Sequence, residues 1–229
     1  MQKYFYINMD RSVARNEHFL DQCQREKVLE PERFSALDGN IHQFTESELN
    51  LFKNCDFLRS PLKSRLMGNQ LSHYYILKDI IKNEYPITVI FQDDSILRKD
   101  FNKIIKKVIK NLPDDAEIVN IGFHKINNGK HFLPWDLTRE DDYKTFSQTL
   151  INEHICKLKH GVNPCSLSYI ITLQGAKNII KFFEETGFLR ATDGNFNDYL
   201  EKLDIFYGSA KVLVTGNHLF ESTVFSNGI

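Results

Sequence analysis

The sequence predicts one α/β domain in which helices flank a mixed, mainly parallel sheet. Segments of strand composition alternate with amphipathic helical segments along the whole chain. Residues 87–91 form a run that is apolar except for Thr88, as expected of a strand that is buried on both faces. The chain has 229 residues, of which 41% are hydrophobic and 26% charged, and this suits a single globular unit. We therefore expect one domain over residues 1–229.

The first elements follow from local signals. Residues 4–8 have the composition of a strand, and Ser12 stands where it can cap a helix that runs to about Lys27. Residues 33–37 form a second short strand that ends at an Asp-Gly turn. Thr45 and Glu48 have the spacing of a capping box, which predicts a further short helix.

The middle of the chain continues the alternation. Apolar residues recur with a helical period over 67–83, before the strand at 87–91, and again over 101–112. Residues 117–122 predict the next strand. Residues 127–161 are polar and lack a period, and we expect much of this segment to be a long loop or flap of the functional kind.

The last third returns to regular structure. Residues 168–173 predict a strand and residues 175–185 a helix. Asp193 can cap one more helix that reaches Leu203, and residues 211–215 predict a last strand.

Charge and cysteine content exclude several classes of protein. The formal net charge is −1, from 29 basic and 30 acidic side chains, so no overall field favours nucleic acid or an anionic membrane. The lysines of the 101–112 segment lie at spacings of an outer helical face. The four cysteines form no C-x-x-C pair, which argues against a zinc site. No stretch has the length and hydrophobicity of a transmembrane span, and no signal peptide is evident, so we expect a cytoplasmic protein.

An acidic pair follows the buried strand. In the segment TVIFQDDS, Asp93 and Asp94 stand at the carboxyl end of the strand, where α/β sheets place their ligands. Two adjacent carboxylates need solvent, hydrogen bonds or a cation to be stable. A divalent metal held by one or two carboxylates and by phosphate oxygens is the usual arrangement at diphosphate sites. The alternative is that the pair caps a helix near Asp100.

Six segments in chain order resemble the motifs of one family. They are YFYINMDRSVARNEHFLDQ, FSALDG, GNQLSHYYILKDI, VIFQDDSIL, SYIITLQGAKNII and ATDGNFNDYL. Together they resemble glycosyltransferase family 25, whose members include lipooligosaccharide sugar transferases and collagen hydroxylysine galactosyltransferases. The resemblance implies a GT-A fold, a nucleotide-binding α/β domain that usually depends on Mn²⁺ or Mg²⁺. One position differs, because Gln92 stands where the family usually has Glu, and an amide is expected to weaken or alter metal binding.

The resemblance implies a metal site and a catalytic base. Asp94 is expected to be the best metal ligand, and Asp93 to ligate or orient. His218, after the last expected strand, matches the C-terminal histidine that completes the metal shell in many GT-A enzymes. Asp193 is the candidate base for the acceptor hydroxyl, or a contact of the donor sugar. Simple helix capping is its alternative, and Asp198 is the reserve candidate.

A second set of residues is expected to bind the nucleotide sugar. Asn8 and the Asp10-Arg11 turn resemble base and ribose contacts, and Arg11 or Arg15 is expected to face the diphosphate. Asp38 and Gly39 are expected to form another wall of the pocket. Gly68, Ser72 and His73 are expected near a helix start, where free N–H groups favour an anion and His73 can bond sugar or phosphate. The alternatives are a surface turn with helix-flanking charges at Asp10-Arg11, a plain turn at Asp38-Gly39 and a structural role for His73. The expected nucleotide-binding set is Asn8, Arg11, Arg15, Asp38, Gly39, Gly68, Ser72 and His73.

These expectations combine into a function. We expect a metal-dependent glycosyltransferase that moves a hexose, galactose or glucose, from a UDP-sugar to a hydroxyl of a glycan or a protein. The expected partners are therefore a nucleotide-sugar donor and a glycan or hydroxylated protein acceptor, and the expected processes are lipopolysaccharide biosynthesis or protein glycosylation. The alternative, motivated by Gln92, is a non-catalytic nucleotide-sugar or glycan-binding protein. A metal phosphohydrolase is a third reading, although the first strand lacks the Asp-x-Asp pattern of aspartate-nucleophile phosphatases.

Overall fold

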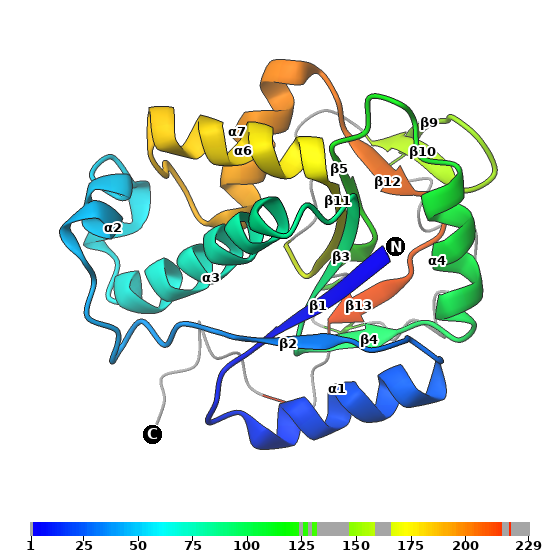
Figure 1. Ribbon diagram of the computed structural model, residues 1–229, viewed down its shortest axis with the longest axis horizontal. Coiled ribbons are helices and arrows are strands. Elements are labelled where there is room, and N and C mark those ends of the chain that lie inside the picture. Colours follow the sequence, from blue (N-terminus) through cyan, green and yellow to red (C-terminus); the bar gives the residue numbers. More distant parts are fainter. Residues whose placement is uncertain are drawn as a thin grey trace.

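The structure is a computed structural model that describes residues 2–123, 126–127, 130–131, 147–158, 166–216 and 220. Figure 1 shows helices on both sides of a twisted central sheet. The helices are α1 (Val13–Arg25), α2 (Glu46–Leu51), the 3₁₀ turn η1 (Asp56–Arg59), α3 (Lys63–Lys82), α4 (Phe101–Lys110), α6 (Leu173–Thr186) and α7 (Thr192–Leu203).

The main sheet has eight strands among the described residues. Their order is β2 (Glu32–Ser35), β1 (Gln2–Asn8), β3 (Ile87–Gln92), β11 (Ser168–Thr172), β5 (Ile118–Asn120), β12 (Tyr207–Ser209), β10 (Ile155–Leu158) and β9 (Ser147–Leu150). Strands β2, β1, β3, β5 and β12 run in one direction, and β11 and β10 run against them. The expected α/β fold with a mixed, mainly parallel sheet flanked by helices is therefore confirmed.

Each face of the sheet has its own apolar core. Helices α3, α6 and α7 pack on one face, around strand residues such as Phe5 and Ile90, whereas α1 and α4 cover the other face around Val89 and Phe91 (Figure 1). Val89, Ile90 and Phe91 are all fully buried, as the apolar run predicts for a strand covered on both sides. The central strand β3 is thus held rigidly between two layers of helices, and the acidic pair follows directly from its end.

Two small sheets complete the described structure. Strand β13 (Val214–Gly216) lies between β4 (Ser95–Leu97) and β6 (Gly122–Phe123), antiparallel to the first and parallel to the second. Strands β7 (Ile126–Asn127) and β8 (Lys130–His131) form an antiparallel pair. In the β4–β13 pair Gly216 stands opposite Ser95, so the C-terminal part of the chain runs beside the acidic pair.

Several expected elements differ from the observed ones. Strands β9 and β10 lie within the segment expected to be a loop, so that expectation is wrong for these two stretches. Helix α3 begins at Lys63, one turn earlier than expected. Ala191 occupies the N-cap of α7, and Asp193 stands in the first turn. The capping alternative for the acidic pair is excluded, because β4 follows the pair directly and α4 begins only at Phe101.

In the part of the chain that the structure describes, no helix combines the length and hydrophobicity that a bilayer crossing requires.

Candidate functional site

The expected site residues gather at one edge of the main sheet. Strands β1, β2, β3 and β5 run in the same direction, so their carboxyl ends meet at that edge. The residues that end these strands are Asn8, Ser35, Gln92 and Asn120. Open α/β sheets bind their ligands at this edge, and the chain places its acidic pair there.

Both carboxylate oxygens of Asp93 accept hydrogen bonds from other side chains of the protein. One of its carboxylate oxygens accepts a hydrogen bond from Asn8 Nδ2 at 2.7 Å, and the other accepts from Arg15 Nη1 at 2.6 Å. The side chains of Asp93 and Arg15 are each 8% exposed, so this is a buried ion pair. Burial raises the pKa of Asp93 most strongly, and the nearby Asp94 adds to the rise, whereas Arg15 and Asn8 oppose it. Asp93 thus has the partners of an orienting residue, and its role as a metal ligand stays a prediction.

Asp94 differs from its neighbour. Its Oδ1 atom is buried and has no hydrogen-bond partner in the described residues. A buried carboxylate oxygen without a donor is costly, because it has lost water and gained nothing in return. A hard divalent cation accepts oxygen ligands of this kind, so Asp94 fits the predicted role. Within the described residues, no three His, Cys, Asp or Glu side chains come together as a metal cluster.

Helix α1 supports the strand that follows the pair. The Gln22 side chain donates to the Ser95 carbonyl oxygen at 3.0 Å and accepts from Leu97 N at 2.9 Å. A side-chain amide therefore pairs with the backbone of β4 as a neighbouring strand would. Because Arg15 lies on the same helix, α1 fixes the chain on both sides of Asp94. The sequence gives no signal for this role of Gln22.

The amide nitrogen of Gln92 faces neighbouring groups of the protein. Its amide nitrogen lies 3.2 Å from the Ser166 carbonyl oxygen, 3.1 Å from Ser166 Oγ and 3.4 Å from His73 Nε2. These contacts join β3 to the residues before β11 and to helix α3.

His73 is a fully buried histidine. Its Nδ1 atom lies 2.8 Å from the Tyr169 hydroxyl oxygen, and its ring contacts Phe196 edge-on. Burial lowers the pKa of His73 to about 3, so the imidazole is neutral near pH 7. Because α3 begins at Lys63, Gly68, Ser72 and His73 lie beyond the first turn of the helix. The expectation that they flank a helix start with free N–H groups is therefore wrong.

Gly68 and Ser72 hold a loop against α3. A Cβ atom on Gly68 would lie 2.5 Å from the Leu37 carbonyl oxygen, and one on Gly39 only 1.7 Å from the Ser64 carbonyl oxygen. Ser72 Oγ donates to the Gly68 carbonyl and accepts from Leu37 N at 2.9 Å. Glycine at 39 and 68 thus allows a close backbone approach, which fixes the Asp38-Gly39 turn beside the sheet edge.

Two turns at this edge are linked by charged side chains. Arg11 forms an ion pair with Asp38, which joins the β1–α1 turn to the β2–α2 loop. Asp10 accepts from Arg33 Nη2 at 2.6 Å and from Ser35 Oγ at 2.8 Å.

The two arginines among the expected nucleotide contacts differ in exposure. The Arg11 side chain is 53% exposed, whereas Arg15 is buried against Asp93. Asn8 accepts from Arg33 Nε at 2.8 Å in addition to holding Asp93. Arg11 is therefore the arginine of the two that can face a diphosphate without breaking a buried pair. The nucleotide contacts themselves stay predictions.

Asp193 lies on the helix that packs near His73. Its Oδ1 atom accepts from Gly194 N at 3.1 Å, and its side chain is half-buried. The preceding Thr192 accepts from Asn69 Nδ2 at 3.2 Å, so the start of α7 is fastened to α3. One turn further on, Phe196 contacts His73. The structure thus connects Asp193 to the site through α3, and its catalytic role stays a prediction.

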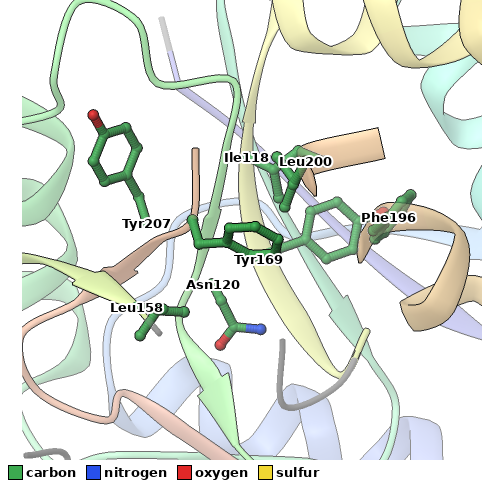
Figure 2. Close-up of a pocket in the computed structure, with 8 residues that line it drawn as sticks. Ile118, Asn120, Leu158, Tyr169, Phe196, Leu200 and Tyr207 are labelled. Carbon is green, nitrogen blue, oxygen red and sulfur yellow. The ribbon is translucent and has the colours of Figure 1, made fainter. Parts of the chain in front are cut away.

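A small, mainly apolar pocket adjoins His73. Tyr169 and Phe196 line it with Asn120 and Tyr207 (Figure 2). The rings of Tyr169 and Phe196 meet edge to face with centroids 5.1 Å apart. The pocket has room for about one water molecule, so it is too small for a sugar.

His218 lies outside the described residues. The described residues on either side of it are close to the acidic pair: Gly216 stands opposite Ser95, and Phe220 packs over the Arg15 guanidinium, 5.9 Å from its ring centroid.

Comparisons with known proteins identify the family of the chain. The profile of glycosyltransferase family 25, described as "LPS biosynthesis protein", matches residues 1–193. A "Glycosyltransferase 25 family member" of Aedes aegypti is 27% identical over 187 residues, which is 77% of this chain and 27% of that protein. Human procollagen galactosyltransferase 2 is 27% identical over 126 residues, which is 52% of this chain and 20% of that protein. The chain therefore spans about a quarter of the length of the curated relatives it matches.

Among solved structures, mouse xyloside xylosyltransferase 1 in its apo form is similar at a TM-score of 0.37 and 10% identity, over 88% of this chain and 69% of that one. The family match covers most of the chain, including the first strand, both carboxylates of the acidic pair and Asp193. The chain belongs to glycosyltransferase family 25.

Proposed function

We propose that this protein transfers a sugar from a nucleotide diphosphate donor to a hydroxyl acceptor, with a divalent cation, Mn²⁺ or Mg²⁺, bound through Asp94. The observation that carries the proposal is the buried Oδ1 atom of Asp94, which has no hydrogen-bond partner in the described residues. Its neighbour Asp93 is neutralised by Arg15, so Asp94 supplies the uncompensated charge of the pair. The cation would offset charge on the leaving diphosphate.

The donor would lie over the carboxyl ends of β1 and β2. Arg11 is the exposed cation at that edge, and its present partner Asp38 is held against α3 by the close contacts of Gly39 and Gly68. A guanidinium matches the oxygens of a diphosphate. We propose that Arg11 exchanges its contact with Asp38 for the donor phosphates.

The transfer requires a base for the acceptor hydroxyl, and Asp193 is the proposed one. The acceptor oxygen forms a bond to the anomeric carbon, and the bond from that carbon to the phosphate oxygen breaks. The hydroxyl proton passes to the Asp193 carboxylate, and the nucleotide diphosphate leaves with the bonding electrons.

The sugar and the acceptor are proposed from the relatives. Human procollagen galactosyltransferase 2 is named for galactose and procollagen, and the family is described as a lipopolysaccharide biosynthesis family. We propose a UDP-hexose, galactose or glucose, as donor, and a glycan or a hydroxylated protein as acceptor.

A panel of nucleotide sugars tests the proposal. The protein is incubated with each donor and Mn²⁺, with and without acceptors of both classes, and released nucleotide is measured. We expect release from a UDP-hexose that stops when EDTA is added. If no member of the panel is turned over or bound, the proposal is wrong.

A binding measurement with UDP and Mn²⁺ tests His218 as a further ligand. Replacing His218 with Gln should weaken the Mn²⁺-dependent binding of UDP, whereas His42→Gln, at a half-buried histidine paired with Glu48, should not. Equal binding by both variants would remove His218 from the site.

A non-catalytic nucleotide-sugar or glycan-binding role is the second candidate, and the observation that favours it is Gln92. An amide stands beside the acidic pair, and its nitrogen faces the protein. This alternative predicts nucleotide binding that is insensitive to chelator and no release of sugar.

A further inference from the structure

The side chain of Gln92 links three parts of the chain just before the acidic pair. Its amide nitrogen is within 3.2 Å of both the Ser166 carbonyl oxygen and Ser166 Oγ, and 3.4 Å from His73 Nε2. Its backbone N–H donates to the Leu167 carbonyl at 2.8 Å. Ser95, on the other side of the pair, also reaches that carbonyl through its hydroxyl at 3.4 Å. Residues 166–167 are thus hydrogen-bonded both to Gln92, which precedes the acidic pair, and to Ser95, which follows it.

The Ser166 carbonyl fixes which way the Gln92 amide faces. A carbonyl oxygen only accepts hydrogen bonds, so the amide atom beside it must be the nitrogen. The opposite orientation would place two oxygens together. The NH₂ group of Gln92 is therefore the part of the side chain that lies next to His73.

This orientation in turn selects the tautomer of His73. A neutral imidazole carries one N–H, and its other nitrogen accepts. Because Nε2 faces the NH₂ of Gln92, Nε2 is the accepting nitrogen, and the proton resides on Nδ1. Nδ1–H then donates to the Tyr169 hydroxyl oxygen, 2.8 Å away. The alternative, a proton on Nε2, would set two donors against each other in a fully buried space.

We propose that Gln92 is a positioning residue: its amide N–H groups hold His73 in the Nδ1–H tautomer and fasten the end of β3 to residue 166, and thereby place Asp94. An acid at this position has no N–H to give, so it could make neither contact in its charged form. The amide thus supplies N–H donors to two acceptors, the neutral His73 and the Ser166 carbonyl oxygen. The part of this proposal that concerns Asp94 rests on the proposed function, whereas the tautomer can be read in the free protein.

Three variants separate this role from a general effect on packing. Gln92→Glu replaces the donor with an acceptor and should move the His73 proton to Nε2. Gln92→Met keeps the length of the side chain and removes both donors. Gln174→Met is the matched control, because Gln174 makes a single 2.7 Å bond to Asn178 on the exposed face of α6.

Nitrogen-15 NMR of the imidazoles reads the tautomer directly. The His73 signals are assigned by their absence from His73→Asn. We expect the Nδ1–H form in the unliganded wild-type protein and in Gln174→Met, and the Nε2–H form in Gln92→Glu. An Nε2–H tautomer in the wild type would overturn the proposal even if Gln92→Glu did not fold. The same tautomer in Gln92→Glu as in the wild type would also overturn it.

Calorimetry with UDP and Mn²⁺ reads the effect on Asp94. Residues that orient a metal ligand typically contribute 10- to 100-fold to affinity, so Gln92→Met should bind about tenfold or more weakly, with Gln174→Met unchanged. Wild-type affinity in Gln92→Met would show that Gln92 does not place Asp94. If the wild type itself bound no nucleotide, the proposed function would fail, while the tautomer result would still stand on its own.

Discussion

Arg15 and Asp93 form a buried ion pair across 78 residues of sequence, with Nη1 and Oδ1 2.6 Å apart and each side chain 8% exposed. The pair connects the first helix to the turn that follows the central strand. It also divides the acidic pair into two residues with different roles: Asp93 is held by the protein, and Asp94 is left with a buried oxygen that no described donor reaches.

Arg15→Met should destabilise the protein strongly. The change leaves Asp93 buried with Asn8 as its remaining donor, and breaking one side of a buried pair typically costs about 3–5 kcal/mol. Urea denaturation measures the change. Arg25→Met is the control, because Arg25 is 53% exposed in its contacts with Asp21 and Glu26, and such pairs contribute about 0–1 kcal/mol.

The double variant Arg15→Met/Asp93→Asn tests the same pair. Removing the charge of Asp93 as well should recover part of the loss, because no unpaired charge stays buried. Additive losses in the double variant would mean that the two side chains stabilise the fold independently.

Gly68→Ala should displace the Asp38-Gly39 turn from α3. The new Cβ would lie 2.5 Å from the Leu37 carbonyl oxygen and 2.6 Å from Gly39 N, both of which are backbone atoms that cannot turn aside. We expect a loss of about 1–3 kcal/mol in the free energy of unfolding.

Gly194→Ala is the matched change on α7. Its Cβ would lie 2.8 Å from Arg190 Cβ and 3.0 Å from Arg190 Cδ. The Cδ atom can rotate away, whereas relief at the Cβ atom requires a small shift of the Arg190 backbone. Alanine is favoured over glycine in a helix by up to about 1 kcal/mol, which offsets part of the cost of that shift, so the loss of stability should be smaller than at position 68. A larger loss at position 194 than at position 68 would contradict the close approach of the turn to α3.

His73 should make the protein less stable as the pH falls. Its pKa is about 3 in the fold, against an ordinary value of 6.5, so below pH 6.5 the unfolded chain binds a proton that the folded chain does not. Stability should therefore decline between pH 6.5 and about 3, by up to about 1.4 kcal/mol per pH unit. Chemical denaturation of the wild type and His73→Asn over this range isolates the contribution. Parallel curves for the two proteins would show that His73 is not buried neutral.

The sequence predicts the parts of the site that depend on local patterns. The apolar run before Asp93 and Asp94 marks a buried strand, and an acidic pair that follows a strand can be recognised from one short segment. The capping box of Thr45 and Glu48 is likewise present as its spacing predicts.

Contacts between distant residues could not be read from the sequence. Nothing in the spacing of Arg15 and Asp93 shows that they form a buried ion pair with each other. Strands β9 and β10 were missed because they are set in a polar segment without a period and are fixed by pairing with each other and with β12. The contacts of Gln92 are likewise invisible in the sequence, because the position of Ser166 and His73 beside it depends on tertiary structure.

Calorimetric titration of UDP in the presence of Mn²⁺ tests the central claim most directly, using the wild type, Asp94→Asn and the exposed control Asp114→Asn. We predict that the wild type and the control bind UDP in a manner that EDTA abolishes. Asp94→Asn should bind at least about tenfold more weakly while it unfolds at an unchanged or higher temperature, because its Oδ1 accepts no hydrogen bond within the described residues. Wild-type affinity in Asp94→Asn, or wild-type binding that persists in EDTA, would contradict the account.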